Sequence, residues 1–478
     1  MSDYLYERVA AGIQAQIEQG TYAPGERLPG VRKLRRQYGV SVATAVAACE
    51  LLEQREILEA RPRSGFYVRG RARHATAPPE VSAEETPGPS LVSGQERVLE
   101  LVQAHHDPDL MSLGAAVPDA GFLPGAALDR SFARVRRRAR RRIAGYDFPP
   151  GSSELRVQVA RRMADAGCST GPDELVVTSG CQEALVLSLR AVANPGEVVA
   201  IESPTFYGIL QAIESLGMRA LEIATDPADG MIPDALAHAL RTWPIRACVM
   251  MPSFGNPLGH LAPPARKAAL VALLREHGVP LIEDDVYGEL AFNSVRPWAA
   301  KAYDEDGDVL YCSSFSKTLG AGLRVGWVAP GRYRDRVMYL KYAGSQASPT
   351  VTTLAVADYL EQGGYERHLR RARRRYERQV RRFVDAIGRH FPEGTRVTRP
   401  RGGFVIWVQL PRSTDAVILQ QRARAVGISI AAGPIFSSSG RYRDCLRLNC
   451  AHPWTDTVAD AVARLGTIAR ELHREGIS

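Results

Sequence analysis

The middle of the chain alternates short apolar runs with longer helical stretches, and this alternation limits the possible folds more than any other feature. Strand-like runs cover 175–178, 198–201, 247–251, 280–283 and 309–312. Stretches with helical periodicity lie between them at 181–193, 232–241 and 264–277. Strands that are apolar on both faces belong to sheets covered by helices on both sides. The pattern therefore predicts an α/β domain with a mostly parallel sheet.

The segments that flank this domain have different compositions. Residues 71–108 contain the run ATAPPEVSAEETPGPS, which predicts a linker that is flexible or extended over its first half. From about residue 365, a long basic helix, a strand at 404–408 and a closing helix from 458 predict a smaller α+β subdomain. We expect a first domain over 1–70, a linker over 71–108 and a domain over 109–478, with a large part to about 364 and a small part over 365–478.

The first 70 residues predict a mainly helical domain with a short β hairpin. Helical periodicity covers 3–20, 31–38 and 44–55. Gly39 ends the second helix, and Ser41 can cap the third. Strand-like residues at 57–61 and 65–68 then enclose Pro62-Arg63-Ser64, which predicts a wing-like hairpin.

The bulk composition is that of a soluble globular protein. Of 478 residues, 45% are hydrophobic and 24% are charged, enough for two or three domains with sizeable cores. The chain has charges throughout its start and no run of about 18 apolar residues, so we expect no signal peptide, no membrane span and a cytoplasmic location. Seven cysteines lack C-x-x-C spacing, which predicts buried small side chains and neither disulfides nor a metal site.

The net charge of +9 is concentrated in two arginine runs, at 134–142 and 367–375. A positive charge is compatible with a nucleic-acid partner but does not identify one. Both runs lie in helical contexts outside the first domain, and we interpret them as solvated faces of surface helices.

Polar motifs follow several of the predicted strands. They are Gly180-Cys181-Gln182, Ser203-Pro204-Thr205-Phe206, Asn256-Pro257, Asp284-Asp285-Val286-Tyr287 and Ser314-Phe315-Ser316-Lys317, with Arg324 and Arg447 further along. Ligands of such sheets bind at the carboxyl ends of the strands, so we expect these motifs to form one site.

The order and spacing of these motifs resemble those of the fold-type I aminotransferases, which use pyridoxal 5'-phosphate (PLP), over about residues 108–475. The resemblance implies that Lys317, as a desolvated amine, bonds covalently to the PLP aldehyde. It implies that Asp284 faces the pyridine nitrogen, and that Arg447 binds the α-carboxylate of an amino compound. The remaining contacts it implies are phosphate contacts from Gly180, Cys181, Gln182, Ser314, Ser316 and Arg324, and ring contacts from Phe206, Asn256 and Tyr287.

Other positions remain open or depart from the family pattern. Tyr146 resembles the tyrosine that reaches a partner subunit's phosphate, which implies a homodimer, but Tyr146 and Phe206 are also compatible with plain core aromatics. Asn256-Pro257 is compatible with a simple turn, and we interpret Asp285 as structural. The stretch Ala431-Ala432-Gly433-Pro434 lacks the proline that often precedes this glycine in relatives, so the loop near the substrate can differ.

The stretch GERLPGVRKLRRQYGVS and the later SGFYV resemble the GntR-type winged helix-turn-helix over about residues 3–69. The resemblance implies binding to double-stranded DNA. The side chains it implies as contacts are Arg32, Lys33, Arg35, Ser41 and Thr44, with Arg61 and Arg63 on the wing. Gly30 and Val42 stand where many relatives have serine and arginine, so a base preference does not carry over. The alternative is a three-helix dimerisation unit.

The combination of the two domains resembles the MocR/GabR subfamily of bacterial regulators. This implies a PLP-dependent transcriptional regulator, associated with the nucleoid when bound to DNA, that senses an amino compound or PLP and forms a head-to-tail homodimer. The second interpretation is an active aminotransferase with an accessory front domain, because Asp284, Lys317 and Arg447 form a complete set. The sequence alone does not separate the two.

Overall fold

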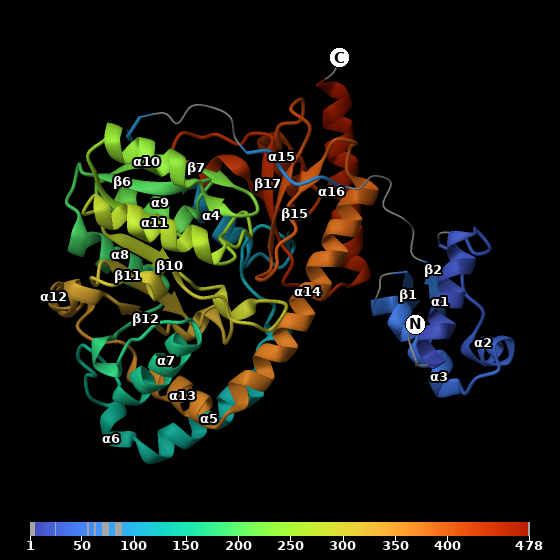
Figure 1. The fold of residues 1–478 in the computed structure, drawn as a ribbon, viewed down its shortest axis with the longest axis horizontal. Helices are drawn as coiled ribbons and strands as arrows, with labels where there is room; N and C mark the ends of the chain where they lie inside the picture. The colour runs from blue at the N-terminus through green and yellow to red at the C-terminus, as the bar shows by residue number, and fades with distance from the viewer. Residues whose placement is uncertain are drawn as a thin grey trace. The chain divides into compact units, whose positions relative to one another are not determined.

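The chain folds as two units, Met1–His74 and Ala75–Ser478. The computed structural model, drawn in Figure 1, describes residues 5–23, 25–54, 57–61, 64–68, 76–81 and 88–476.

The first unit contains three helices and a two-stranded antiparallel hairpin. The helices are α1 (Leu5–Glu18), α2 (Val31–Tyr38) and α3 (Val42–Gln54), and the strands are β1 (Leu58–Arg61) and β2 (Gly65–Val68). The core is formed by apolar side chains from all five elements, namely Val9, Ile13, Leu34, Ala45, Leu52, Leu58 and Val68. The predicted three-helix domain with a wing is therefore confirmed.

Two predicted boundary residues act as expected in this unit. Gly39 follows α2 with φ of 64°, in the left-handed region that glycine adopts easily. Ser41 Oγ accepts a hydrogen bond of 3.0 Å from the Thr44 N–H and so caps the start of α3. These two residues fix the tight turn between α2 and α3.

The second unit is built around a nine-stranded sheet in the order β3-β7-β6-β9-β10-β11-β12-β5, with β8 paired to β7. The strands are β3 (Ser90–Leu91), β5 (Val176–Thr178), β6 (Val198–Ser203), β7 (Arg219–Asp226), β8 (Gly230–Met231), β9 (Ile245–Met250), β10 (Leu281–Asp284), β11 (Val309–Ser314) and β12 (Gly326–Ala329). The central strands from β7 to β11 are parallel, whereas β3 and β12 run antiparallel to their neighbours. The prediction of a mostly parallel sheet is confirmed.

Successive residues of a strand point to opposite faces of this sheet. Because the strands carry apolar residues on both sides, both faces are apolar, and helices cover both. In β6, Val199 and Ile201 belong to a core cluster with α8 and α9, whereas Val198 and Ala200 belong to another with α10 and α11. The helices of this large part are α5 (Gly125–Arg138), α6 (Arg140–Ile143), α7 (Ser153–Asp165), α8 (Cys181–Val192), α9 (Tyr207–Ser215), α10 (Pro233–Thr242), α11 (Pro264–Glu276), α12 (Arg334–Ser345) and α13 (Thr350–Glu361).

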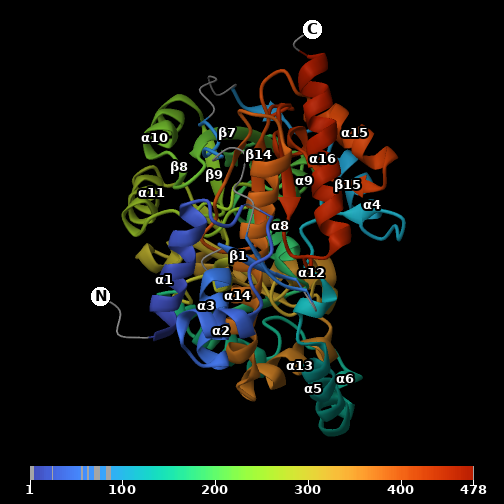
Figure 2. The ribbon, with the colours of Figure 1, turned by 90° about the vertical axis from the view of Figure 1, so that its right-hand side faces the viewer.

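The small part packs three helices with a four-stranded antiparallel sheet in the order β13-β14-β17-β16. Its elements are α14 (Gly364–His390), β13 (Arg396–Val397), β14 (Val405–Gln409), α15 (Ala416–Ala425), β15 (Ile428–Ser429), β16 (Ala431–Ala432), β17 (Cys445–Asn449) and α16 (Asp456–Glu475). Figures 1 and 2 show α16 alongside α14, and both helices contribute to one core cluster. The short strand β4 (Met111–Ser112) pairs with β15, so residues near 111 complete the small part from an early position in the chain.

The described part of the predicted linker is attached to the second unit. The Val397 N–H donates to Ala77 O at 2.9 Å, and β3 pairs with β7. Helix α4 (Arg97–Ala104) buries Val98 and Leu101 in a cluster with Trp407. Residues 71–75 and 82–87 of the predicted linker lie outside the described residues.

The arginine runs lie on α5, α6 and α14, and most of their side chains are exposed. The interpretation as purely solvated faces is wrong for Arg373, which is 4% exposed and donates from Nε to Glu289 O at 2.7 Å. Arg373 falls on the inner face of α14 because it follows Leu369 by one helical turn.

The remaining expectations concern cysteines, metal ions and membranes. All seven cysteines are buried and unpaired, as predicted. Within the described ranges, no three or more His, Cys, Asp or Glu side chains gather as a metal site would require. No helix in that part of the chain is both long and apolar enough to cross a membrane.

Candidate cofactor and ligand site

The predicted motifs lie where neighbouring strands of the large sheet end. Strand β10 ends at Asp284 and β11 ends at Ser314, two strands that run parallel side by side. Helix α8 begins at Cys181 directly after β5. The carboxyl edge of the sheet therefore brings these segments together, as expected for this class of fold.

Lys317 lies inside this edge, with its amine close to backbone and aromatic groups. Its Nζ donates to Ala116 O at 2.9 Å and lies 5.8 Å from the centre of the Tyr287 ring. Loss of solvent, reinforced by the positive charge of Arg447 and opposed by Asp284, lowers the pKa of Lys317 to about 8. The neutral, nucleophilic amine is therefore far more populated near pH 7 than in an exposed lysine.

Asp284 is 2% exposed, and its burial raises the pKa of its carboxyl to about 7. Asp285 also raises this pKa, whereas the Cys181 thiol, which donates to Asp284 Oδ1 at 3.4 Å, and Lys317 lower it. A cation placed against this carboxyl would favour its ionised form.

Asp285 points to a different set of partners. Its carboxylate forms a buried ion pair with Arg296 and accepts a hydrogen bond of 2.8 Å from the Tyr311 hydroxyl. These contacts agree with its interpretation as a structural residue.

A cradle for an anion lies at the start of α8. Arg324 has a φ of 51° and donates from Nη2 to Ser179 O at 2.7 Å. Gly180 has a φ of 88°, and a Cβ there would lie 2.6 Å from Arg324 Nη2. A Cβ on Gly326 would lie 2.6 Å from the carbonyl carbon of Gly180. Glycine is therefore required at 180, beside the Arg324 guanidinium, and at 326, beside the backbone of Gly180. The guanidinium and the free N–H groups of the first turn of α8 together attract anions.

Two predicted hydroxyls lie beside this cradle. Ser314 pairs with Gly326 across β11 and β12, and its Oγ accepts from the Ser316 N–H at 3.3 Å. Gln182 contributes the backbone of the first turn of α8, while its side chain donates to Gly208 O at 2.7 Å.

Arg447 lies fully buried in β17 between two aromatic rings. Its guanidinium carbon is 5.5 Å from the centre of the Tyr207 ring and 5.0 Å from that of Phe436. Its Nη1 donates to Asn256 Oδ1 at 3.0 Å, and its Nη2 donates to Gly114 O. These contacts hold the planar fork in one orientation, which suits two-point binding of a carboxylate.

Two buried polar atoms in this site, the Tyr287 hydroxyl and Arg447 Nε, make no hydrogen bond of good geometry with the described residues, although the Tyr287 hydroxyl lies near the Asn256 side chain. Buried polar groups are normally paired, so unpaired ones need an explanation. A ligand with oxygen atoms would supply both partners. The residues therefore fit a group that combines a phosphate with a ring oxygen, together with a carboxylate.

Two predicted aromatic residues have less specific surroundings. Phe206 is half-buried and packs against Tyr207, with ring centres 4.6 Å apart. Tyr146 is 70% exposed and stacks on Phe148 at 5.3 Å, and Phe148 in turn lies 5.9 Å from Tyr342.

Sequence reasoning missed several residues that shape the site. Lys317, Arg447 and Asn449 all donate to backbone carbonyls of residues 114–117, a segment whose side chains give no sign of this role. Thr318 forms two hydrogen bonds with α14. Its hydroxyl is 3.0 Å from the Tyr365 hydroxyl, and its backbone oxygen is 2.7 Å from His368 Nε2. Each of these contacts joins segments that are distant in sequence, so no local pattern predicts it.

In the first unit, the predicted DNA contacts lie on exposed parts of α2 and α3. The side chains of Arg32, Lys33 and Arg35 are exposed on α2, and Ser41 and Thr44 lie at the start of α3. Arg61 ends β1, with its side chain outside the described residues, and Arg63 lies outside them altogether. The described side chains are accessible to a polyanion.

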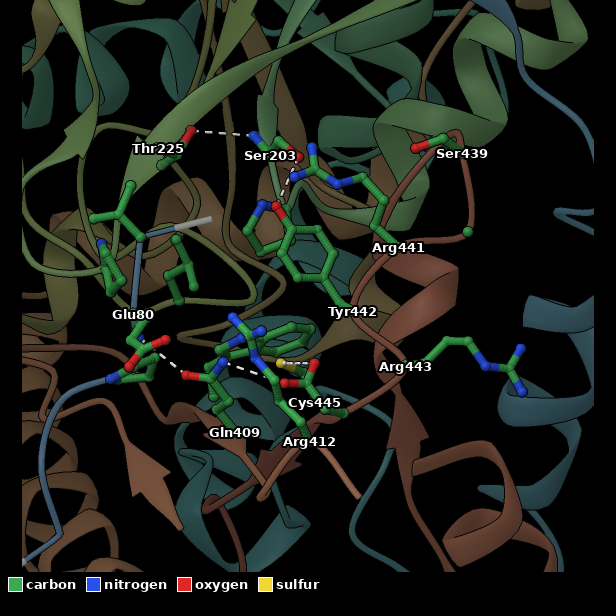
Figure 3. Close-up of a pocket in the computed structure, with 18 residues that line it drawn as sticks. Glu80, Ser203, Thr225, Gln409, Arg412, Ser439, Arg441, Tyr442, Arg443 and Cys445 are labelled. Atoms are coloured by element: carbon green, nitrogen blue, oxygen red, sulfur yellow. Dashed lines mark hydrogen bonds between the residues drawn. The ribbon is translucent and has the colours of Figure 1, made fainter. Parts of the chain in front are cut away.

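A cavity of about 680 Å³ lies beside this site and is lined by other residues (Figure 3). Its wall includes Ser203, whose hydroxyl is 2.8 Å from that of Tyr442, and Arg441, whose side chain reaches toward Ser203. Arg443 extends away and pairs with Asp415 at 2.6 Å. None of the predicted ligand residues lines this cavity.

Comparison with known proteins gives two family matches. Residues 5–68 match the model of the bacterial regulatory proteins of the gntR family. Residues 109–465 match the model of aminotransferase class I and II. The two matches correspond to the two units of the structure.

Individual relatives match this chain over most of its length. The chain is 40% identical to the uncharacterized HTH-type transcriptional regulator YjiR of Escherichia coli K12, over 96% of this chain and 98% of that protein. It is 26% identical to the probable rhizopine catabolism regulatory protein MocR of Rhizobium meliloti, over 90% of this chain and 86% of that one.

A solved structure resembles the second unit. LysN, the alpha-aminoadipate aminotransferase of Thermus thermophilus, complexed with N-(5'-phosphopyridoxyl)-L-leucine, matches with a TM-score of 0.73 and 29% identity. The match covers 80% of this chain and 95% of that structure. With a gntR-type domain in front of an aminotransferase class I and II domain, the chain belongs to the MocR/GabR-like subfamily of GntR-type regulators.

Proposed function

We propose that the chain is a PLP-dependent transcriptional regulator that binds DNA through its first unit and an amino compound through its second. One observation carries this proposal. A winged helix-turn-helix with exposed basic residues shares one chain with a site in which Lys317, Asp284, Asn256 and Arg447 are all present and buried or partly buried. Relatives of the whole chain bear the names of transcriptional regulators.

The residues of the site support PLP as the cofactor of the second unit. Gly180, Ser314, Ser316 and Arg324 would hold its phosphate, Asp284 would pair with its ring nitrogen, and Tyr287 and Asn256 would bind its ring oxygen. PLP supplies an aldehyde that bonds reversibly to amines and a ring that withdraws electrons. Lys317, with its lowered pKa, presents the amine that such an aldehyde needs.

The amino compound would be recognised by the two parts of the second unit together. Arg447 belongs to the small part and would bind a carboxylate, whereas Lys317 belongs to the large part. A ligand that contacts both Arg447 and Lys317 binds most tightly to the conformation in which both contacts are made. Such a ligand would favour a closer approach of the small part to the large part. This gives the ligand a means of changing the shape of the unit.

A homodimer would complete this arrangement. The side chains of Tyr146, Phe148 and Tyr342 are between 50% and 70% exposed, and Phe148 contacts both of the others. Exposed aromatic clusters of this kind mark protein interfaces. A partner subunit seated there would bury them, and Tyr146 would be available to that subunit's phosphate site.

The second candidate function is that of a working aminotransferase, and the completeness of the site favours it. Lys317, Asp284 and Arg447 are all present, Asp284 and Arg447 are buried, and hydrogen bonds hold the Lys317 amine and the Arg447 guanidinium in place. The DNA-binding unit would then only locate the enzyme.

Parallel measurements of DNA binding and of amino-donor turnover separate the two functions. If the chain is a regulator, its DNA affinity should depend on the state of the ligand site, and turnover should be slow or incomplete. Rapid turnover with many amino donors, together with DNA binding that ignores them, would support the aminotransferase instead. Lys317→Ala serves as the control that abolishes turnover in either case.

A further inference from the structure

The outer face of α14 carries a continuous stripe of exposed arginines, which we call the arginine stripe. Its members recur every three or four residues: Arg367, Arg370, Arg371, Arg374, Arg375, Arg378 and Arg381. The opposite face is buried and includes Tyr365, Leu369, Ala372, Tyr376, Val380 and Phe383. At 1.5 Å per residue, the stripe is about 21 Å long. The helix therefore displays a row of cations on one side.

The charge of the whole molecule is unevenly distributed. Helices α5, α6 and α14 together contain 18 arginines and 4 acidic residues, a surplus of 14 positive charges. Since the whole chain has a net charge of +9, the rest of it is slightly acidic, with a net charge of −5. Like charges three or four residues apart repel each other on a helix. An arrangement that costs stability in this way is expected to have a use.

The stripe contains few internal partners. Arg381 pairs with Glu377 at 2.5 Å, and Arg375 donates to Gly121 O at 3.0 Å. For the other five arginines of the stripe, the described part of the chain offers no ion pair. These five guanidinium groups remain free to bind an external anion.

An arginine from α5 adds to the same surface. Helix α13, which carries Tyr359, packs against both α5 and α14. Burial raises the pKa of Tyr359, and the positive charges of Arg371, Arg130 and Arg367 lower it. Arg130 is exposed. The positive surface therefore extends from α14 across to α5.

Helix α14 also contacts the neighbourhood of Lys317 from its buried face. Tyr365 and His368 both bond to Thr318, the residue after Lys317, at 3.0 and 2.7 Å. Tyr376 packs on Phe404 with ring centres 5.0 Å apart, and Phe404 packs on Tyr287 at 5.4 Å. A shift of α14 would therefore move Thr318 and Phe404, which lie next to Lys317 and Tyr287 of the ligand site.

We propose that the arginine stripe, together with Arg130, binds the phosphate backbone of DNA in addition to the contacts made by the first unit. The proposal rests on the proposed function, since it assumes that the chain binds DNA. Guanidinium groups match phosphate oxygens in geometry, and DNA presents a phosphate about every 3.4 Å along each strand. Because both units belong to one chain, binding of the first raises the local concentration of DNA around the second.

The test compares two triple variants of the full chain that remove the same charge from different places. The stripe variant is Arg370→Gln, Arg374→Gln and Arg378→Gln. The matched control is Arg241→Gln, Arg424→Gln and Arg464→Gln, which are exposed residues outside the stripe. The probe is a duplex of random sequence about 60 base pairs long, and affinity is measured between about 50 and 200 mM salt, because phosphate contacts do not depend on sequence.

We expect the stripe variant to flatten the slope of log affinity against log salt by about 0.9 for each phosphate that it no longer binds. For three phosphates, the affinity ratio of wild type to variant should shrink about 40-fold between 50 and 200 mM salt. The control variant should keep the wild-type slope.

Three results would overturn the proposal. Equal slopes in wild type and the stripe variant would show that the stripe does not touch DNA, and would leave the proposed function standing if the wild type binds. An equal loss in the control variant would show a general charge effect only. Absence of DNA binding by the wild type would reject the proposed function as well. If the triple stripe variant fails to fold, as judged by circular dichroism, the three single variants are measured instead, each with an expected slope change of about 0.9.

Discussion

At Lys317 and Asp284, one physical cause acts in opposite directions on a base and an acid. Loss of solvent lowers the pKa of Lys317 to about 8 and raises that of Asp284 to about 7. The neutral form of each side chain is therefore more populated near pH 7 than it would be in water. Neither charge is well stabilised in the site in the absence of a ligand. This makes the cofactor-free protein sensitive to pH.

The first prediction concerns the stability of the cofactor-free protein. In the folded protein, the Asp284 carboxyl keeps its proton up to about pH 7. In the unfolded chain, it loses this proton near pH 3.8. Between these values the folded state binds more protons, so this residue's contribution to stability is lost as pH rises, by up to about 1.4 kcal/mol per pH unit. Relative to wild type, Asp284→Asn should gain about 2 to 3 kcal/mol between pH 4.5 and 7.

Urea denaturation at both pH values measures this difference. Asp335→Asn, at a fully exposed carboxylate, is the matched control and should show no such pH dependence. A constant difference between wild type and Asp284→Asn across this range would contradict the assignment of a raised pKa to Asp284.

The second prediction concerns the covalent link to the cofactor. Protein incubated with excess PLP should absorb visible light, and borohydride reduction should attach the cofactor permanently to Lys317, because its amine has a lowered pKa and lies between Tyr287 and the 114–117 segment. Peptide mapping by mass spectrometry identifies the lysine. The buried Lys267, which also has a lowered pKa, is the internal control and should stay unmodified because it is bonded to Ser253 and to the Trp298 carbonyl. Modification of another lysine in place of Lys317 would reject the site.

At the scale of elements, the sequence predicted those segments whose residues follow one rule throughout. The runs at 198–201 and 309–312 are uniformly apolar and form β6 and β11, and Ser41 caps α3 as its type and position require. Strand β7 was not predicted because Glu222 interrupts its apolar pattern. That carboxylate is buried and accepts hydrogen bonds from Ser437 and Ser438, partners more than 200 residues away.

The sequence predicted those parts of the candidate site that stand in local motifs, as it did for the helices and strands. Residues whose side chains carry the chemistry, such as Lys317, Asp284 and Arg447, stand in recognisable motifs. The carbonyls of 114–117 and the pairing of β4 with β15 depend on long-range packing, which leaves no local pattern. Arg373 shows the limit of reading a charged run as one surface, because the helical period places one of its members inside.

The third prediction concerns helix α2 of the first unit. Replacing Arg32 by glutamine should flatten the slope of log DNA affinity against log salt by about 0.9, because one phosphate is no longer neutralised. Arg8→Gln, at an exposed position on α1 of the same unit, is the matched control and should leave the slope unchanged. Identical slopes for the two variants would show that α2 does not lie against the DNA backbone.

At the scale of the whole molecule, the proposed regulation requires that ligand binding in the second unit affect DNA binding by the first. The small part contributes Arg447, the large part contributes Lys317, and α14 joins them while contacting Thr318. A ligand that binds both parts can therefore change the position of α14. Any effect of the ligand on DNA binding must be matched by an equal effect of DNA on ligand binding.

The most direct test of the central claim is the affinity of the PLP-loaded protein for its DNA site, measured with and without an amino compound that changes the absorption of the bound cofactor. A DNA site is first selected from a random library by the full chain. The proposed regulation predicts a change in DNA affinity of about 5- to 150-fold, equivalent to about 1 to 3 kcal/mol. It also predicts that Arg447→Ala, which cannot bind the carboxylate, has the same DNA affinity with and without the compound. Equal DNA affinity of the wild-type protein in both states would contradict regulation by the amino compound and would favour an enzyme that is only anchored to DNA.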